Sequence, residues 1–166
     1  MSAKLAGAAL AVVALGLAFM TFRPSEFPNT TLSAGGESST IDQLRGTKPK
    51  LVLALIMPND VMSKAAVEKL KGEYVRLEGR ATFAALMFAD ETQAAAFEKA
   101  NELPFAVYSL TPQQHPVEYN EVVKTVGGFR KRFFVGTVLV LDSKRKITQQ
   151  VNGDELENLG AVLQKL

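Results

Sequence analysis

Residues 50–58, KLVLALIMP, decide the fold class of this chain of 166 residues. The run from Leu51 to Met57 is entirely apolar and lies between two prolines, which is the pattern of a strand buried on both faces. A helix is predicted directly after this strand, over residues 60–76, with Asp60 as its N-cap. A buried strand followed at once by a helix is the unit of α/β proteins, so we expect a sheet with helices packed on it.

The same alternation of apolar strands and amphipathic helices continues to the end of the chain. Further strands are predicted at residues 81–88, 103–110, 133–141 and 146–151. Helices are predicted at 90–100, at 117–126 and from 153 onward, after one helical turn at 41–45. The buried face of the helix at 60–76 is expected to comprise Val61, Ala65, Leu70, Tyr74 and Leu77. Alternating strands and helices imply parallel pairing, and the closing hairpin adds an antiparallel edge, so the predicted fold is an α/β three-layer sandwich with a mixed sheet.

The composition excludes several kinds of chemistry. The chain has no cysteine, so it can form no disulfide, use no thiol nucleophile and hold no thiolate-bound metal. Its one histidine, His115, excludes a metal site built from several histidines, and we interpret it as a solvated loop residue. A net charge of +2 gives no indication of nucleic-acid binding. No cofactor is predicted, and Asp60 is interpreted as a helix cap rather than a catalytic acid.

The segment at residues 5–22 has no charged side chain and lacks the polar stripe of a surface helix. As a helix it would be roughly 27 Å long, close to a hydrocarbon thickness of about 30 Å. We therefore predict an N-terminal membrane anchor, a transmembrane helix, at residues 1–23. A cleaved signal peptide and a buried helix are the alternatives. Against cleavage, the run is longer than a usual signal core and ends in the bulky Phe19, Met20 and Phe22.

The charges that flank the predicted anchor are nearly balanced, with Lys4 before it and Arg23 after it, and they lean towards an N-terminus inside the cell. This signal-anchor arrangement would place the remaining chain outside the cytoplasm, in the periplasm of a Gram-negative bacterium. Residues 24–40 are rich in Pro, Ser, Thr and Gly, which predicts a flexible linker with a short strand at 30–33. The folded domain is then expected at residues 41–166.

Several phrases, in their order along the chain, resemble the thioredoxin fold of the TlpA/ResA-type membrane-anchored family and its peroxiredoxin relatives. They are TIDQLRG at 40–46 with Lys48 and Pro49, ELPF at 102–105, and VLVLDSKRKI at 138–147 with VNG at 151–153. The resemblance covers residues 29–166. It implies a thioredoxin-like mixed sheet, and a Cys-x-x-Cys pair at the start of the helix that follows the first core strand.

That redox pair is missing from this chain. By the resemblance, its window corresponds to Asn59, Asp60, Val61, Met62 and Ser63, and the family's cis-proline position corresponds to Gly136 and Thr137. A methionine thioether cannot supply the thiolate that disulfide exchange requires. We therefore expect a vestigial redox site, and we predict that the protein is not an enzyme.

Positive charge and aromatic side chains gather around the predicted closing hairpin. The residues predicted to dock a partner are Phe129, Arg130, Lys131, Arg132, Lys144, Arg145 and Lys146. Their charge suits an acidic protein partner, or anionic lipid head groups close to the anchor. The alternative is a solvated charged face, with Phe129 packed under the last helix.

The sequence supports two hypotheses for function. The first is a membrane-tethered, redox-inactive thioredoxin-like domain that acts as an interaction or assembly module in an extracytoplasmic membrane complex, with a protein partner and without nucleic acid. The second is a non-thiol enzyme or small-ligand binder that uses the strand–helix junction at residues 59–63. An apolar and basic surface at this junction would favour the first hypothesis, and a large polar pocket with perturbed titratable groups would favour the second.

Overall fold

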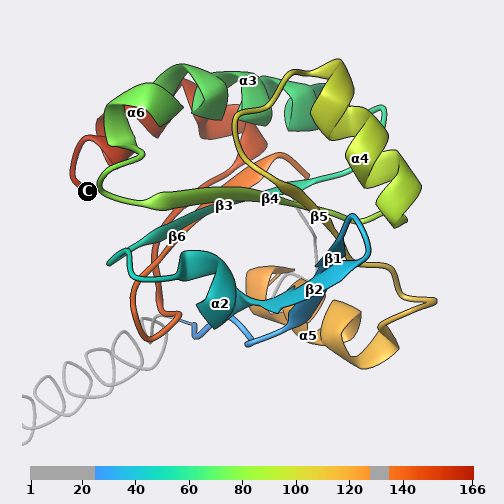
Figure 1. Ribbon diagram of the computed structural model, residues 1–166. Helices are drawn as coiled ribbons and strands as arrows, with labels where there is room; N and C mark the ends of the chain where they lie inside the picture. Colours follow the sequence, from blue (N-terminus) through green and yellow to red (C-terminus); the bar gives the residue numbers. More distant parts are fainter. Residues whose placement is uncertain (1–24, 128–134) are drawn as a thin grey trace, which may run out of the picture.

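The computed structural model describes residues 25–127 and 135–166, and a seven-stranded sheet with helices on both faces runs through this part of the chain (Figure 1). The strands are β1 (Thr31–Ala34), β2 (Glu37–Thr40), β3 (Leu51–Ile56), β4 (Thr82–Met87), β5 (Val107–Ser109), β6 (Thr137–Leu141) and β7 (Ile147–Val151). The helices are α2 (Ile41–Arg45), α3 (Val61–Leu77), α4 (Glu91–Ala100), α5 (Pro116–Gly127) and α6 (Leu159–Leu163), with a 3-10 helix η2 (Gly153–Asn158) before α6.

The strands follow the order β2-β1-β5-β4-β3-β6-β7 across the sheet. The central pairs β3–β4 and β4–β5 are parallel, whereas β6 is antiparallel to both β3 and β7. Helices α3, α4 and α6 cover one face of the sheet, and α2 and α5 cover the other (Figure 1). The predicted α/β three-layer sandwich is confirmed, with both its parallel centre and its antiparallel hairpin.

Strand β3 is buried on both faces, as its apolar run predicts. All six of its residues have no exposed surface. Val52, Ala54 and Ile56 pack into the core beneath α3, and Leu51, Leu53 and Leu55 pack into the core on the opposite face. Because successive side chains of a strand point to opposite faces, one short run supplies the centre of both cores.

The predicted buried face of α3 is partly wrong. Leu70 and Leu77 are buried, and Ala65 and Tyr74 are partly buried against the same core, but Val61 is 76% exposed. Val61 is the first residue of the helix, and side chains in a helix lean towards its N-terminus. Its side chain therefore extends beyond the end of the sheet. The positions nearest the sheet are instead Ser63, Ala66 and Val67.

Of the flexible linker predicted at residues 24–40, the short strand at 30–33 appears as β1, but the described residues around it are folded rather than flexible. Strands β1 and β2 form a hairpin there, and β1 also pairs with β5. Phe27 and Leu32 are fully buried in the core that α5 covers. Gly35 and Gly36 have positive φ angles of 59° and 82° and form the hairpin turn. The Ser, Thr and Gly content that resembles a linker belongs to this turn and to an exposed edge strand.

The chain ends differ from the predicted elements as well. The predicted closing helix is a 3-10 helix followed by the five-residue α6. Leu156 and Leu159 are both buried, and their spacing of three residues suits a 3-10 turn, where such positions eclipse.

Across residues 25–127 and 135–166, none of the helices is both long and apolar enough to cross a bilayer. The segment predicted as an anchor, residues 1–23, lies outside the described residues.

Candidate functional site

The junction between β3 and α3 uses its polar groups to build the helix start. Asp60 is the N-cap, and its carboxylate accepts a 2.6 Å hydrogen bond from the backbone N–H of Ser63. The Ser63 side chain is fully buried, and its hydroxyl accepts a 2.9 Å hydrogen bond from the backbone N–H of Met57. Asn59 has a positive φ of 59°, which turns the chain from strand to helix. The predicted cap is confirmed, and both polar side chains are occupied by the fold.

Residues far apart in the sequence close around Met62. Gly136 lies directly before β6 and donates a 2.9 Å hydrogen bond from its N–H to the carbonyl of Leu55. A Cβ atom on Gly136 would lie 2.7 Å from the carbonyl oxygen of Met62. A Cβ atom on Gly153 would lie 2.9 Å from the Met62 methyl carbon. The structure therefore brings Met62, in the predicted window, together with Gly136. The Met62 side chain also packs against Gly153.

The remaining predicted positions at this junction are also structural. Thr137 is fully buried, and its hydroxyl lies 3.5 Å from the side-chain oxygen of Asn152. His115 is half-buried at the entry to α5, where its carbonyl accepts the N–H of Tyr119. Within the described part of the chain, no three Asp, Glu or His side chains form a metal-binding group. No nucleophile is paired with a base at the junction among these residues.

Two apolar side chains at the junction are exposed instead. Met57 is 39% exposed and Val61 is 76% exposed, one on each side of the Asn59 turn. Beside Met57 lies a hollow of about 530 Å³, whose lining residues include Met57, Phe88, Asp90, Thr111, Gln114 and Tyr119. The rings of Phe88 and Tyr119 meet edge to face at 5.5 Å. Ligands bind outside the carboxyl ends of parallel strands in this kind of sheet, and that rule could have indicated these residues from the sequence.

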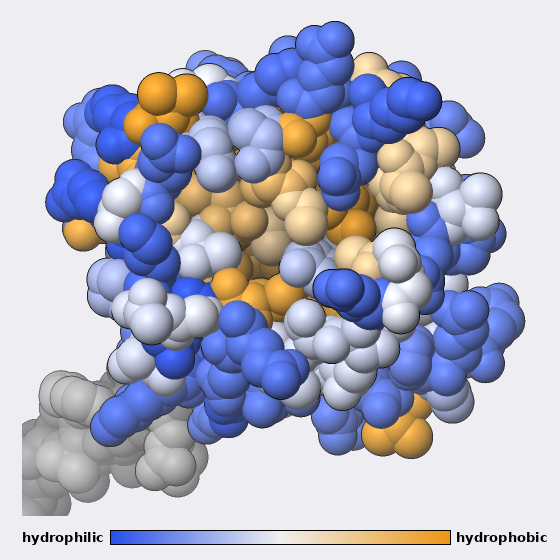
Figure 2. Space-filling model, viewed as in Figure 1, coloured by the Kyte–Doolittle hydropathy of each residue, from blue (hydrophilic) through white to orange (hydrophobic). Residues whose placement is uncertain are grey.

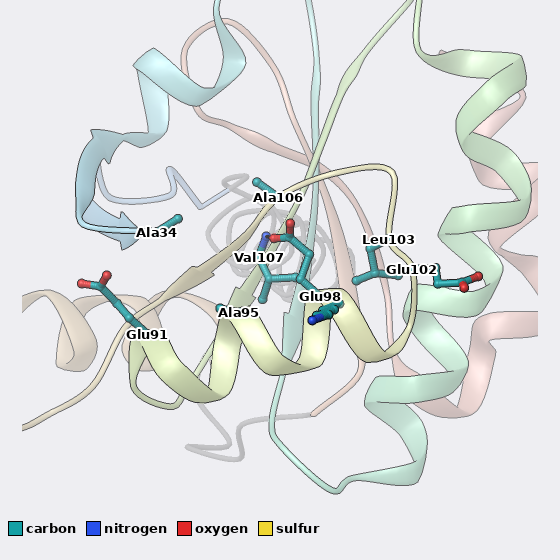
Figure 3. A pocket seen from close by; sticks show the side chains of 10 residues that line it. Ala34, Glu91, Ala95, Glu98, Glu102, Leu103, Ala106 and Val107 are labelled. Carbon is teal, nitrogen blue, oxygen red and sulfur yellow. Dashed lines mark hydrogen bonds between the residues drawn. The ribbon is translucent and has the colours of Figure 1, made fainter.

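A second hollow, of about 540 Å³, lies between α4, the loop after it and the β1–β2 turn (Figure 3). Near the middle of the face seen in Figure 2, apolar side chains are visible over β4 and β5. The carboxylates around the second hollow are engaged in the fold: Glu91 accepts the Gly36 N–H at 3.0 Å, and Glu98 accepts the Val107 N–H at 2.8 Å. They hold the hairpin turn and β5 in place.

Three of the seven predicted docking residues lie in the described part of the chain. Phe129, Arg130, Lys131 and Arg132 lie outside the described residues. Lys144, Arg145 and Lys146 lie in the turn between β6 and β7. Because Leu141 pairs with Leu51 at the start of β3, this turn lies at the opposite end of the sheet from Asn59. Docking by these residues stays a prediction.

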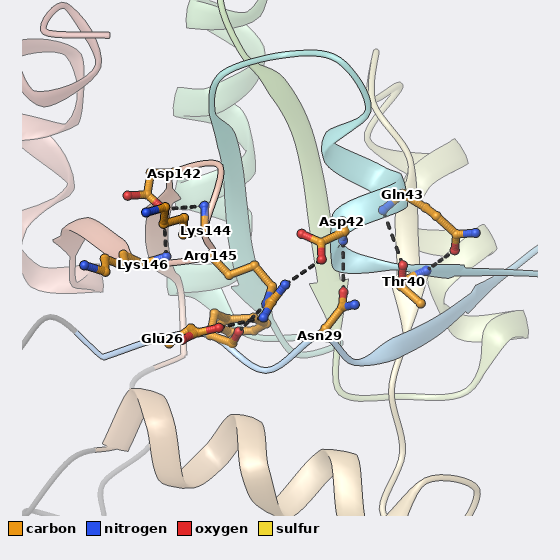
Figure 4. Close-up of polar contacts among 10 residues, drawn as sticks. Glu26, Asn29, Thr40, Asp42, Gln43, Asp142, Lys144, Arg145 and Lys146 are labelled. Carbon is orange, nitrogen blue, oxygen red and sulfur yellow. Dashed lines mark hydrogen bonds and ion pairs between the residues drawn. The ribbon is translucent and has the colours of Figure 1, made fainter.

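Arg145 is committed to contacts within the chain (Figure 4). Its guanidinium forms ion pairs of 2.5 Å with Asp42 and 2.6 Å with Glu26, and it donates a 3.2 Å hydrogen bond to the carbonyl of Phe27. Its φ of 58° is positive, which is uncommon for a residue with a side chain. Arg145 therefore joins the hairpin turn, α2 and the N-terminal segment. The sequence offers no sign of this role, because its partners lie more than a hundred positions away.

Asp142 organises the same turn, and its charge is expected to contribute to stability. Burial acts to raise the pKa of its carboxyl, but hydrogen bonds from the backbone N–H groups of Lys144 and Lys146 outweigh it, together with the charges of Lys50 and Lys146, so the pKa lies below its ordinary value. A carboxyl with a lowered pKa in the folded state stabilises the protein above its unfolded-state pKa. This contribution is lost as the pH falls through the folded-state pKa.

We expect the variant D142N, which keeps an acceptor oxygen but no charge, to be less stable than the unmodified protein at pH 7. The difference should shrink as the pH falls below about 4, the ordinary pKa of an aspartate in the unfolded chain, and towards the lower pKa of the folded state. Urea unfolding of both proteins between neutral and acidic pH measures this. A difference that is independent of pH would contradict the assigned role of the charge.

Comparisons with known proteins agree with this architecture. No protein-family model matches the chain, and no curated protein matches it. Solved structures do match. A putative protein disulfide isomerase from Bacteroides thetaiotaomicron superposes with a TM-score of 0.66 at 13% identity, covering 86% of each chain. The thioredoxin domain of a thiol-disulfide oxidoreductase from Bacteroides vulgatus gives 0.65 at 14% identity, covering 84% of this chain and 95% of that one.

Peroxiredoxin Q from Xanthomonas campestris gives a TM-score of 0.63 at 13% identity, over 85% of this chain and 94% of that one. Likeness at such low identity shows the fold and not the activity. The fold class is α/β with a mixed central sheet and helices on both faces. Within that class the chain has a thioredoxin-like fold.

Proposed function

We propose that this protein is a redox-inactive, membrane-tethered thioredoxin-like domain that serves as an interaction or assembly module in an extracytoplasmic membrane complex. The observation that carries the proposal is the state of the β3–α3 junction. The polar groups of Asp60 and Ser63 are used for capping, and Met62 fills the space beside Gly136 and Gly153. The junction keeps its structural parts without a group that could exchange disulfides.

The apolar side chains at this junction support a role in binding. Met57 and Val61 are among four large apolar residues that are exposed in the described part of the chain. Both follow the carboxyl end of the central strand, and Met57 lines the hollow together with Phe88 and Tyr119. Apolar side chains next to an aromatic-lined hollow provide the kind of anchor that dominates binding energy in protein interfaces. The partner would place its own apolar group there.

The membrane tether and the extracytoplasmic location rest on the sequence. The uncharged run at residues 5–22 has the length of a transmembrane helix. A domain tethered in this way is held near its partners, which raises its effective concentration at a membrane complex. The complete absence of cysteine in the chain leaves binding as its simplest role there.

Val61 and Val75 provide a matched pair of positions to test this. Both are valines of α3, with exposed fractions of 76% and 79%, but Val61 lies at the junction and Val75 near the other end of the helix. We expect a photo-crosslinking amino acid at position 61 of the full chain to capture a discrete protein in native membranes, and the same group at position 75 not to. Val61→Glu should weaken recovery of that protein about tenfold, whereas Val75→Glu should leave it unchanged.

The same experiment contains its contradiction. Equal capture from both positions, or recovery of the chain alone as a monomer, would count against an interaction module. Both valines are exposed, so the two glutamate variants should unfold within about 0.5 kcal/mol of the unmodified protein. A matching stability excludes misfolding as the reason for lost binding.

The second candidate function is a small-ligand binder. The hollow of about 530 Å³ beside Met57 favours it, since this volume lies within the range of small-molecule sites, roughly 300–1,000 Å³. Met57 lines the hollow, but Asn59–Ser63 do not. The ligand would therefore contact the neighbouring strand ends rather than the predicted junction. A small molecule that protects Met57→Cys from thiol labelling, but not Val75→Cys, would favour this candidate.

A further inference from the structure

The first described residues of the chain are fixed to the β6–β7 turn. The N–H of Ile147 donates a 3.0 Å hydrogen bond to the carbonyl of Ser25, and the N–H of Phe27 donates a 2.8 Å hydrogen bond to the carbonyl of Arg145. Glu26 forms an isolated bridge with Lys146 and an ion pair with Arg145. Phe27 is fully buried. The chain therefore enters the domain at one defined place, at the end of the sheet where β3 begins.

Only a very short stretch of chain connects this entry point to the predicted anchor. Ser25 is two residues beyond Arg23, where the predicted anchor ends, and two residues of extended chain span roughly 7 Å. This step rests on the anchor of the proposed function. With residues 1–23 in the membrane, so short a connection holds the β6–β7 turn within about one Debye length of the bilayer, which is about 8 Å at physiological salt. Charges at this end of the sheet would then act directly on lipid head groups.

The same end of the sheet carries a cluster of cationic side chains from three separate connections. Leu51 at the start of β3 pairs with both Thr82 of β4 and Leu141 of β6, so the segments next to these residues meet. They contribute the set that we call the basic end: Lys48, Lys50, Arg80, Lys144 and Lys146. In the part of the chain that the structure describes, none of these five forms an ion pair with a carboxylate.

The carboxylates at the basic end are mostly engaged elsewhere. Glu26 and Asp42 pair with Arg145, and Asp142 accepts the N–H groups of its own turn. Glu78, at the C-cap of α3, is the carboxylate there without an ion pair among the described residues. The five cations of the basic end, together with Arg145, therefore outnumber the four carboxylates Glu26, Asp42, Glu78 and Asp142 beside them.

Among the residues that the structure describes, the opposite end of the sheet carries more carboxylates than cations. Asp60 and Asp90 cap helices there, and Asp154 and Glu155 begin η2, close to Met62, with Lys64 as the nearby described cation. Arg130, Lys131 and Arg132, which precede β6 in the sequence, lie outside the described residues. An anionic leaflet attracts nearby Lys and Arg side chains and repels carboxylates. The basic end is also the end at which the chain enters the domain, so its cations are the ones held near the predicted anchor.

We propose that the basic end lies against an anionic lipid surface and holds the domain upright, so that Met57 and Val61 point away from the membrane. Strand β3 separates the two ends by six residues, which corresponds to roughly 20 Å. The apolar junction would thus be presented at a fixed height above the bilayer. From the sequence, the lysines of the β6–β7 turn could bind either a protein partner or lipid. The proposal assigns them to lipid.

The absence of cysteine makes this orientation measurable, because single cysteines can be labelled without removing any other. Ser143 is an exposed residue of the β6–β7 turn, and Gln113 is an exposed residue at the opposite end. The full-length variants S143C and Q113C would be labelled with a fluorophore and reconstituted into vesicles of phosphatidylcholine with or without phosphatidylglycerol. Spin-labelled lipids in the head-group layer then report, through quenching, which label lies nearer to the bilayer.

We expect the label at position 143 to be quenched about threefold more than the label at position 113 in anionic vesicles. The difference should fall by about half or more when Lys50, Lys144 and Lys146 are replaced by glutamine, or in about 1 M salt, where the Debye length is roughly 3 Å. Circular dichroism checks that the variants are folded.

The other outcomes separate the inference from the function on which it rests. If the chain fails to float with vesicles after a carbonate wash, the anchor and the proposed function are wrong. If it floats but both labels are quenched equally, or equally with and without phosphatidylglycerol, the anchor stands and the lipid contact is overturned. A difference that appears in native membranes and disappears in protein-free vesicles would assign the lysines to a protein and overturn the inference as well.

Discussion

Replacement of Phe27 by alanine is expected to lower the free energy of unfolding by about 3–5 kcal/mol. The ring is fully buried in the core formed with Leu32, Leu51 and Val122, although it lies in a segment whose composition resembles a linker. Removing it leaves a cavity that the surrounding strands cannot fill without losing their own contacts. The midpoint and slope of urea unfolding, with the variant and the unmodified protein side by side, measure the loss.

Two other residues calibrate this result. Phe97 of α4 is 8% exposed. Its replacement by alanine shows how much a core phenylalanine outside residues 25–40 contributes to the free energy of unfolding. Val75 is 79% exposed, and its replacement by alanine should change stability by less than about 0.5 kcal/mol. If Phe27→Ala behaved like Val75→Ala, residues 25–40 would be a tether and the hairpin of β1 and β2 would contribute nothing to the core.

Gly136→Ala is expected to have the second largest effect, a loss of about 2–4 kcal/mol. Two causes add at this position. The φ of 76° lies in the left-handed region, which a side chain disfavours, and the new methyl group would lie 2.7 Å from the carbonyl oxygen of Met62. The clash is with backbone rather than with the end of a flexible side chain, so either α3 or the start of β6 has to move.

Gly72 of α3 is the control for this substitution. A Cβ atom there meets nothing within 4 Å, and its φ is not in the positive range. Since alanine is favoured over glycine in a helix, Gly72→Ala should raise stability by about 0.5–1 kcal/mol. Thermal unfolding of both variants gives the comparison. Equal effects at the two positions would show that the Met62 contact does not constrain the junction.

The sequence predicts the parts of the fold that depend on local pattern. Strand β3 and the cap Asp60 follow from an apolar run and from a side chain that can accept a backbone N–H, and both appear as expected. The short strand predicted at 30–33 appears as β1, but β2 is not predicted, because its four residues of Glu, Ser and Thr at an exposed edge have no apolar pattern. The place of the β1–β2 hairpin in the sheet is set by β5, whose pairing with β1 no local rule reveals.

The candidate site shows the same division. The family resemblance indicates a window that includes Met62 and a position at Gly136, and the structure places these two residues in contact. The exposure of Val61 could not be foreseen, because helical spacing gives the relative orientation of side chains but not where the sheet ends. The role of Arg145 depends on partners at Glu26 and Asp42, and it emerges only from the complete fold.

The pairing of β3 also has a consequence for how the chain is made. Its two neighbours in the sheet are β4 and β6. Strand β4 follows β3 after a single helix, whereas β6 is the last but one of the strands to be synthesised. Until residue 141 has been produced, one edge of the most apolar strand has no partner, and Phe27 has no turn at Arg145 to dock on. Domains dominated by such long-range pairing fold slowly and expose adhesive edges in the meantime. Until β6 has been synthesised, this edge of β3 is therefore an unpaired apolar strand edge, the kind of surface at which nascent chains aggregate.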